Sequence, residues 1–309
     1  MNKIVFFNHY HRGDLHTSKE FVRQVIKELP DDIIFEYQHD NPPELLDDLN
    51  IKSTPLLHTL DKKNPVVKIE NTLYINTWVG SQWDIFCEHG GINMNTFYDQ
   101  WGLLFKAINK FFDSNLELYS KKEKYLPVID WNSICETSKK EIDKWVVPHN
   151  KKRKKVLICN NNPISGQSFS SNMQEWIEPL AKSNPDVQFI LTDAIDKTMK
   201  NISYTYSIST NKNESDLREI SYLSTMCDVI IGKNSGPYVY CETYTNYMNK
   251  DKKFISYNTK NPQFDTIKET MSNGVKHLCE YTTVPIIDPN TLTVADRDMI
   301  KKSLSESLR

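Results

Sequence analysis

Residues 228–238 read Asp228-Val-Ile-Ile-Gly-Lys-Asn-Ser-Gly-Pro-Tyr238. The stretch starts with a short apolar run, which is typical of a strand buried on both faces of a parallel sheet. Small and polar residues follow, and Pro237 suits the first turn of a helix. A strand that passes through a tight loop directly into a helix is the repeating unit of parallel α/β sheets. The stretch therefore predicts such a sheet in the C-terminal half of the chain.

The rest of the C-terminal half repeats this pattern of buried strands and amphipathic helices. Apolar runs predict strands at 155–159, 187–192, 228–232 and 254–257. Helical spacing of apolar residues predicts helices at 172–180, 216–226, 238–248 and 293–308. This alternation is typical of a Rossmann-like domain.

The N-terminal half opens with the same alternation. Lys3-Ile-Val-Phe-Phe-Asn8 predicts a buried strand, and apolar residues at helical spacing follow it as far as Pro30. Further strands are expected at 32–37, 66–70 and 72–76, and helices from Asn41, at 94–112 and at 131–146. The run 148–155 carries five basic residues and predicts a solvated linker. We therefore expect two Rossmann-like domains, 1–150 and 151–309, the second ending in the helix 293–308.

Composition restricts the class of protein. With 309 residues, 39% hydrophobic and 25% charged, the chain suits two globular domains. No stretch approaches the roughly 20 apolar residues of a spanning helix, and the N-terminus lacks a signal peptide, so a cytoplasmic protein is expected. Peripheral membrane contact is left open. The net charge of −2 argues against a nucleic-acid partner, and the six scattered cysteines predict reduced thiols.

The segment His9-Tyr-His-Arg-Gly-Asp-Leu-His16 follows the first predicted strand. Open α/β sheets bind their ligands at this end of the strands. Asp14, Thr17 or Ser18 could simply cap the next helix. Capping does not account for three histidines, an arginine and an aspartate within eight positions, so we predict a functional loop here, with Gly13 allowing a sharp turn.

A metal site is one alternative for this segment. His9, His11, Asp14 and His16 offer ligand atoms, but no matching cluster of histidines or carboxylates occurs elsewhere in the sequence. A catalytic metal needs further ligands in a closed set. We therefore expect no bound metal, and a metal-dependent hydrolase stays a minority hypothesis.

The loop 232–237 is a candidate anion site. Backbone N–H groups at the start of a helix attract phosphate groups, and the loop could add the charge of Lys233 and the hydroxyl of Ser235. It contains neither a Walker motif nor a G-x-G-x-x-G pattern. An ordinary connection between strand and helix is the competing interpretation.

Together, Gly13-Asp14 and Gly232-Lys-Asn-Ser-Gly-Pro237 make the chain resemble the lipopolysaccharide heptosyltransferase-like group of GT-B glycosyltransferases. The resemblance implies an α/β fold with two Rossmann-like domains facing across a cleft. This chain differs from the group in two ways. Lys233 stands where that group usually has Asn, and the histidine-rich segment around Asp14 is unusual for the group. This loop is similar to that of fucosyltransferases of the same architecture.

The resemblance also implies a reaction: displacement at the anomeric carbon of a nucleotide sugar, with transfer of a hexosyl, heptosyl or fucosyl group to a hydroxyl of a glycan or glycoconjugate. Asp14 would be the general base, with His11 or His16 in reserve. Lys233, Arg12 and the helix after Pro237 would stabilise the leaving diphosphate without a metal or other cofactor.

The candidate binding residues fall into two groups. Those for the donor are Arg12, Gly13, Ser165, Gly166, Gln167, Lys233, Asn234, Ser235, Gly236, Pro237 and Glu242. Those for the acceptor are Trp78, Trp83 and His89. Core packing explains the two tryptophans equally well. A nucleotide-sugar epimerase or hydrolase of the same fold, and a carbohydrate-binding protein without turnover, are further alternatives.

Overall fold

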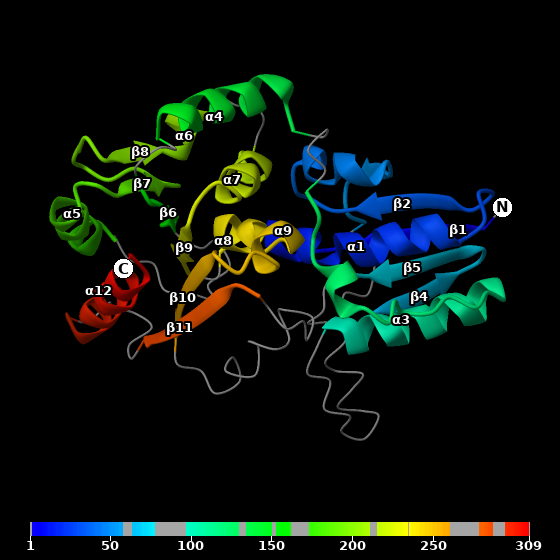
Figure 1. The fold of residues 1–309 in the computed structure, drawn as a ribbon. Helices are drawn as coiled ribbons and strands as arrows, with labels where there is room; N and C mark the ends of the chain where they lie inside the picture. Colours follow the sequence, from blue (N-terminus) through cyan, green and yellow to red (C-terminus); the bar gives the residue numbers. More distant parts are fainter. Residues whose placement is uncertain are drawn as a thin grey trace. The chain divides into compact units, whose positions relative to one another are not determined.

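The computed structural model describes residues 2–57, 64–77, 97–129, 134–149, 153–161, 173–210, 215–233, 235–259, 278–286 and 294–308. The chain divides into two compact units (Figure 1), with the division between Val128 and Ile129. We call the part up to Val128 unit 1 and the part from Ile129 unit 2. None of the helices in these ranges is long and apolar enough to cross a membrane.

Unit 1 contains a sheet with the strand order β3-β2-β1-β5-β4. Its strands are β1 (Lys3–Phe7), β2 (Ile34–Gln38), β3 (Lys52–Thr54), β4 (Val66–Ile69) and β5 (Thr72–Asn76). β1, β2, β3 and β5 run parallel, and β4 pairs antiparallel with β5 across a tight turn. The central strand β1 is almost entirely buried, as its continuous apolar run predicts.

Two helices of unit 1 run along the strands of this sheet (Figure 1) and pack on each other. They are α1 (Arg12–Glu28) and α3 (Phe97–Phe112). Phe21 of α1 stacks on Trp101 of α3 at a centroid distance of 5.9 Å, and it meets Phe105 edge to face. The short helices η1 (Pro43–Leu49) and η3 (Lys122–Tyr125) both contact α1.

Unit 2 contains a six-stranded parallel sheet with the order β11-β10-β9-β6-β7-β8. Its strands are β6 (Lys155–Cys159), β7 (Gln188–Leu191), β8 (Ile202–Tyr204), β9 (Val229–Gly232), β10 (Lys253–Thr259) and β11 (Glu280–Ile286). Numbered within the unit, the order is 3-2-1-4-5-6, the order of a dinucleotide-binding fold. The strand order reverses between β6 and β9, so this fold predicts a ligand at their carboxyl ends.

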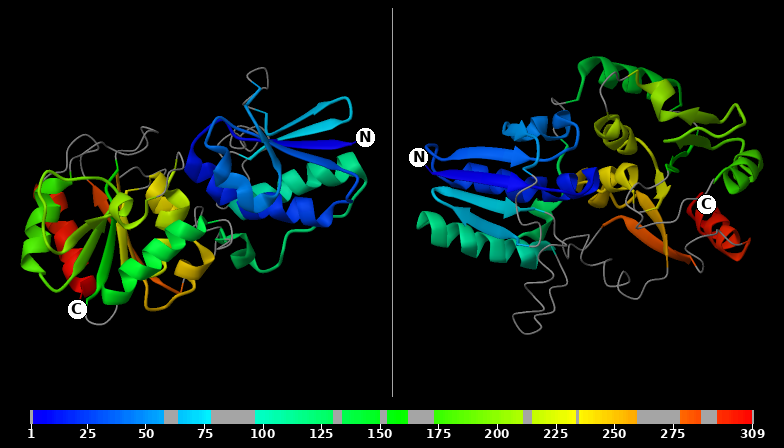
Figure 2. Two further views of the ribbon diagram at one scale, coloured as in Figure 1. Left: turned by 90° about the horizontal axis from the view of Figure 1, so that it is seen from above. Right: turned by 180° about the vertical axis from the view of Figure 1, so that it is seen from behind.

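Helices cover both faces of the unit 2 sheet. They are α4 (Glu136–His149), α5 (Gln174–Ser183), α6 (Thr205–Ile208), α7 (Leu217–Ser224), α8 (Gly236–Cys241), α9 (Tyr244–Tyr247) and α12 (Val294–Leu308). In the left view of Figure 2, α12 (red) lies on one side of the sheet and α8 (yellow) on the other. Trp176 of α5 and Ile300 of α12 join the core on one face, and Tyr238 of α8 packs on Phe254 on the other.

The division between the units lies earlier in the chain than the sequence-based boundary at 150. Helix α4, which that boundary places in the first domain, makes its contacts with unit 2. Glu141 accepts hydrogen bonds from the backbone N–H and the hydroxyl of Thr210 (2.8 and 2.7 Å), and Tyr222 donates one to Asp143 (2.6 Å). Helix α4 therefore belongs to unit 2, and the division between the units precedes the basic run 148–155.

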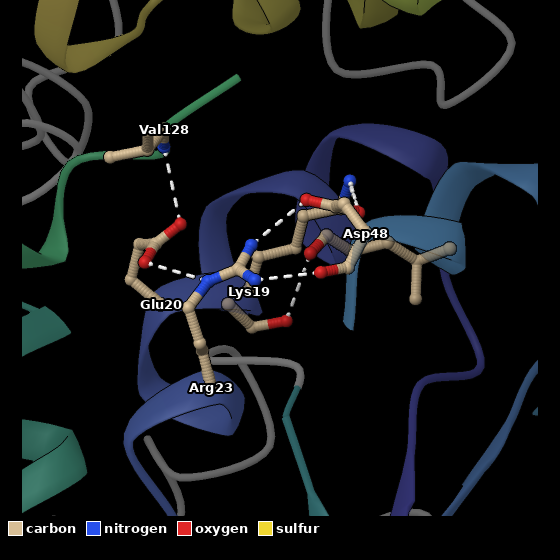
Figure 3. A network of polar contacts seen from close by, with 7 residues as sticks. Lys19, Glu20, Arg23, Asp48 and Val128 are labelled. Atoms are coloured by element: carbon tan, nitrogen blue, oxygen red, sulfur yellow. Dashed lines mark hydrogen bonds and ion pairs between the residues drawn. The ribbon is translucent and has the colours of Figure 1, made fainter. Parts of the chain in front are cut away.

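A network of buried charges ties α1 to the rest of unit 1 (Figure 3). Asp48 of η1 accepts hydrogen bonds from Lys19 (2.7 Å) and from Arg23 (2.9 Å). Glu20 accepts one from Arg23 (3.1 Å) and one from the backbone N–H of Val128 (3.2 Å). The network thus connects α1 with η1 and with the point where the chain leaves unit 1.

Candidate active site

The carboxyl ends of three parallel strands place polar residues along one edge of the unit 1 sheet. Asn8, His39 and Thr77 directly follow β1, β2 and β5, and all three are buried. The Asn41 side chain donates a hydrogen bond to the Tyr10 carbonyl (3.2 Å), which joins the loop after β1 to the loop after β2. His39 had no role in the sequence analysis; its place at the end of a predicted strand was the available signal.

Helix α1 begins at Arg12, so most of the predicted histidine-rich loop is the first turn of a helix. The expectation that the whole segment from His9 to His16 forms a loop was therefore wrong. The reason is local: the backbone N–H of His11, the N-cap residue, donates to the Asp14 carboxylate (3.2 Å). A carboxylate at the third helical position that binds this N–H is half of a capping box, and it starts the helix early.

Asp14 is partly exposed, and its surroundings make its carboxylate a stronger base than an ordinary aspartate. Burial of the carboxyl group raises its pKa above the ordinary value, although the His11 N–H and the nearby His11 side chain act in the opposite direction. A carboxylate with a raised pKa is a stronger base at neutral pH. His11 and Arg12 lie beside it at the start of the helix. The capping alternative and the catalytic hypothesis thus apply to the same group.

His16 is on a different face of the helix. Residues two positions apart on a helix do not face each other, and His16 is buried with 4% of its surface exposed. Burial, together with the charge of Lys19, lowers its pKa to about 3. It is therefore neutral and a weak base at neutral pH, so we do not assign it to the reaction.

The buried position of His16 argues against the metal site that the sequence left as an alternative. With His16 buried away from Asp14, the four residues His9, His11, Asp14 and His16 do not form one ligand set. Within the ranges that the structure describes, no three His, Cys, Asp or Glu side chains are grouped to hold a metal ion.

In unit 2, Gly232 ends β9 at the point where the strand order reverses. It pairs with Cys159 at the end of β6. A Cβ atom on Gly232 would lie 2.7 Å from the Cys159 Cβ and 2.9 Å from the Tyr238 ring. The close approach of the two strand ends therefore requires glycine here.

The residues after Gly232 suit an anionic ligand. Lys233 is fully buried, and burial lowers its pKa to about 8, so it still carries its charge at neutral pH. The Ser235 hydroxyl is buried as well, and it has no hydrogen-bond partner among the described residues. A buried polar group without a partner requires an explanation, and a bound ligand is one. Gly236 and Pro237 form the first turn of α8.

Glu242 follows α8 and is enclosed by tyrosines. The Tyr281 hydroxyl donates to its carboxylate at 3.5 Å, and only 8% of the residue is exposed. Burial raises its pKa to about 7, against hydrogen bonds from Tyr247 and Tyr281 that lower it. The structure thus places Glu242 in the interior of unit 2, and its predicted contact with a donor stays a prediction.

We expect the Glu242→Gln variant to be more stable than the wild type above pH 7. The folded protein holds a proton on Glu242 up to about pH 7, whereas the unfolded chain releases it near the ordinary glutamate pKa of 4.5. Stability therefore falls as the pH rises between these values, by about 3 kcal/mol in total. Glutamine imitates the protonated form. Thermal unfolding should show a higher Tm for the variant at pH 8 and no difference at pH 4.5.

Glu141→Gln is the control for this experiment, because the exposed Glu141 carboxylate accepts two hydrogen bonds from Thr210 that lower its pKa. It should bring no gain in stability at pH 8. An equal Tm difference for Glu242→Gln at both pH values would show that the carboxyl group titrates normally.

The sequence analysis missed an aromatic pair at the same edge of unit 2. Tyr204 ends β8, and its ring stacks on that of Tyr206 at 5.3 Å and 7°. Tyr206 is 55% exposed. Asp193, two residues after β7, is exposed beside this edge, where dinucleotide-binding folds place an acidic residue for the ribose. The pair could have been suspected from the aromatic residues in Ser203-Tyr-Thr-Tyr206.

Several predicted site residues lie outside the described ranges. They are Trp78, Trp83, His89, Ser165, Gly166, Gln167 and Asn234. The described candidates fall into two groups: His11, Arg12, Gly13 and Asp14 at the start of α1 in unit 1, and Lys233, Ser235, Gly236 and Pro237 after β9 in unit 2.

No family model matches the chain, and no curated protein matches it in sequence. Its fold is similar to that of the glycosyltransferase family 9 protein from Veillonella parvula DSM 2008, with a TM-score of 0.55, 11% identity, and 99% of this chain and 97% of that chain covered. It is also similar to E. coli heptosyltransferase WaaC with ADP-2-deoxy-2-fluoro heptose, with a TM-score of 0.53, 7% identity, and 98% and 99% covered.

A third similar structure is UDP-GlcNAc 2-epimerase from Neisseria meningitidis bound to UDP-GlcNAc, with a TM-score of 0.46, 9% identity, and 98% and 100% covered. The two structures with higher scores confirm the expected fold class of two α/β domains of the GT-B type. They also confirm the resemblance in fold to the heptosyltransferase-like group.

Proposed function

We propose that the chain is a glycosyltransferase that moves a sugar from a nucleotide-sugar donor to a hydroxyl group of an acceptor. The observation that carries the proposal is the reversal of strand order between β6 and β9, where Gly232 lets the strand ends approach and the Ser235 hydroxyl is buried without a partner among the described residues. This is the place where such sheets bind nucleotides. The fold shared with a family 9 glycosyltransferase supports the same conclusion.

The donor would lie along the carboxyl edge of unit 2. Its diphosphate would bind after β9, where Lys233 supplies a positive charge and Ser235 a hydroxyl group. The ribose would reach Asp193, and the base would stack on the exposed Tyr206. Stacking on an aromatic ring does not depend on which base is present, so this assignment leaves the choice of base to other contacts.

The proposed reaction is a displacement at the anomeric carbon. The Asp14 carboxylate takes the proton of the acceptor hydroxyl, and the oxygen forms the new bond to the anomeric carbon. The bond from that carbon to the diphosphate breaks, and the electron pair leaves with the nucleoside diphosphate. Lys233, with Arg12 as a second cation, would stabilise the leaving group, so the reaction would need no metal.

The proposal is tested by thermal unfolding with UDP, GDP, ADP, CMP and their sugars, with and without EDTA. A ligand that binds only the folded state stabilises it, by about 2.7 kcal/mol at a hundred times its Kd. We expect one nucleoside diphosphate and its sugar to raise the Tm whether or not EDTA is present. Destabilisation by EDTA without any nucleotide effect would favour the metal-dependent hydrolase. Conversion of the nucleotide sugar without release of the diphosphate would favour an epimerase.

We expect the Tyr206→Ala variant to bind the stabilising nucleotide more weakly. Loss of one base-stacking contact costs about 1–3 kcal/mol, which is roughly 5- to 150-fold in Kd. Isothermal titration calorimetry measures the change. Tyr244→Ala is the matched control, since Tyr244 is a 43% exposed tyrosine of the same unit on α9. Equal Kd values for the two variants would show that Tyr206 does not contact the base.

A further inference from the structure

Four polar side chains are buried together at the carboxyl edge of the unit 1 sheet. They are Asn8, Ser18, Tyr37 and Thr77, and none has more than 1% of its surface exposed. They come from four different parts of the unit: the residue after β1, the second turn of α1, β2, and the residue after β5. The proposed reaction assigns no role to any of them.

Tyr37 is the centre of this group. Its hydroxyl makes hydrogen bonds with the hydroxyls of Thr77 and of Ser18, the latter at 3.3 Å. The Asn8 side chain donates to the same Thr77 hydroxyl at 3.5 Å. The Ser18 hydroxyl also donates to the Leu15 carbonyl (3.1 Å), and the Thr77 hydroxyl donates to the Phe7 carbonyl (3.3 Å). The Tyr37 hydroxyl therefore joins α1 to the end of β5.

The group lies next to the candidate base. Ser18 is four residues after Asp14 on α1, and residues four apart occupy the same face of a helix. Burial raises the pKa of Tyr37 to about 12, and the negative charge of Asp14 acts in the same direction. The Tyr37 hydroxyl is thus within the electrostatic range of the Asp14 carboxyl group.

Packing alone does not explain this hydroxyl. The Tyr37 ring packs against Phe6 at a centroid distance of 6.1 Å, and phenylalanine would preserve that contact. An apolar core of the same shape can be about as stable as one that buries hydrogen-bonded hydroxyl and amide groups. What the hydrogen bonds add is a fixed distance between α1 and the end of β5.

We propose that Tyr37 is a positioning residue for Asp14. Its hydroxyl holds the first turns of α1 against the end of β5, so that the Asp14 carboxyl group keeps its orientation and its degree of burial. This inference rests on the proposed function, because it assigns Asp14 as the base. Tyr37 itself contacts neither donor nor acceptor.

The test compares Tyr37→Phe with Tyr125→Phe. Tyr125 is also fully buried in unit 1, and its hydroxyl bonds to the Gln24 side chain, ten residues further along α1 than Asp14. The readouts are the pH profile of nucleoside diphosphate release from the nucleotide sugar that stabilises the wild type, and the Kd of that nucleotide. Tyr37→Phe should lower the rate about tenfold, the equivalent of one hydrogen bond.

Tyr37→Phe should also move the acidic limb of the pH profile to lower pH, because water that reaches Asp14 reduces the effect of burial on its pKa. The Kd of the nucleotide should change far less than the rate, because all of its proposed contacts except that of Arg12 lie in unit 2. Tyr125→Phe should keep the wild-type rate and profile even where it lowers the Tm. The same rate and the same profile in both variants would overturn the inference.

A second measurement separates this inference from the proposed function. Amide hydrogen exchange at residues 11–18 needs no ligand, and it should be faster in Tyr37→Phe than in Tyr125→Phe. Ser18→Ala, which removes the partner of the Tyr37 hydroxyl on α1, should have the same effect if Tyr37→Phe does not fold. Equal exchange in all three variants would refute the positioning role. A wild type that releases no diphosphate from any nucleotide sugar would refute the proposed function instead.

Discussion

Asp14→Asn should abolish most of the turnover while the protein stays folded. General-base catalysis contributes typically 10²–10⁴-fold to a rate, and asparagine cannot accept the proton. We therefore expect the rate of sugar transfer, measured as release of the nucleoside diphosphate, to fall by about 10²–10⁴-fold. The Kd of the nucleotide should not change, because Asp14 is proposed to contact the acceptor hydroxyl and not the nucleotide. In the wild type, the acidic limb of the pH profile should lie above the ordinary pKa of an aspartate, as burial raises the pKa of Asp14.

The substitution separates the two roles of Asp14. An asparagine oxygen at this third helical position can still accept the His11 N–H. The helix start should therefore survive, and the Tm should change little. Asp40→Asn is the matched control: Asp40 is an exposed aspartate of the same unit, and it also accepts one backbone N–H, that of Leu56 at 3.2 Å. A comparable loss of rate in both variants would argue against Asp14 as the base.

The parallel sheet of unit 2 could be predicted from sequence because its central strands are continuous apolar runs. The predicted strands at 155–159 and 228–232 correspond to β6 and β9. Two outer strands were missed. β8 has only three residues, and β11 contains two threonines and a proline, a composition that does not stand out as a buried strand. The reversal of strand order, which marks the ligand edge, became visible only when both sheet edges were known.

The boundaries of the helices were harder to predict than the central strands. The single predicted helix 238–248 is divided into α8 and α9, because Thr243 caps α9 by accepting the Asn246 N–H. Such a cap depends on backbone geometry that apolar spacing does not reveal. The start of α1 was missed for the same reason. That error mattered for the site, because the position of the helix start decides that Asp14 is partly exposed while His16 is buried.

The candidate residues at the two loops could be identified because glycine, charge and hydroxyl groups follow predicted strands. Side-chain contacts between residues far apart in the sequence could not be predicted. Asp48 pairs with Lys19 and Arg23 across 29 and 25 residues, and Tyr37 meets Thr77 across 40. Nothing in the local sequence connects these positions. Tyr37 and Thr77 become neighbours because the sheet brings the ends of β2 and β5 to one edge, and Asp48 meets Lys19 and Arg23 because η1 packs on α1.

Asp48→Asn should destabilise unit 1 by about 3–5 kcal/mol, the typical cost of removing one partner from a buried ion pair. Only 3% of the Asp48 side chain and 5% of the Lys19 side chain are exposed. Without the carboxylate, the Lys19 charge stays buried without its counterion, and Arg23 loses its 2.9 Å contact. Although burial opposes it, the charges of Lys19 and Arg23 hold the pKa of Asp48 below its usual value. The difference from the wild type should therefore disappear in acid, as the pH falls through that lowered pKa.

Hydrogen exchange along a urea series measures the free energy of unfolding of each unit separately. The loss of stability caused by Asp48→Asn should appear in unit 1 alone. Glu178→Gln is the control, because Glu178 also accepts two lysines, Lys182 at 2.6 Å and Lys197 at 3.0 Å. Both of those lysine side chains are more than 60% exposed, and surface pairs of this kind contribute about 0–1 kcal/mol. Asp48→Asn could instead lower the free energy of unfolding by no more than Glu178→Gln does. In that case water or a shifted side chain would have to compensate the Lys19 charge, and the network could not be what holds η1 and Val128 to α1.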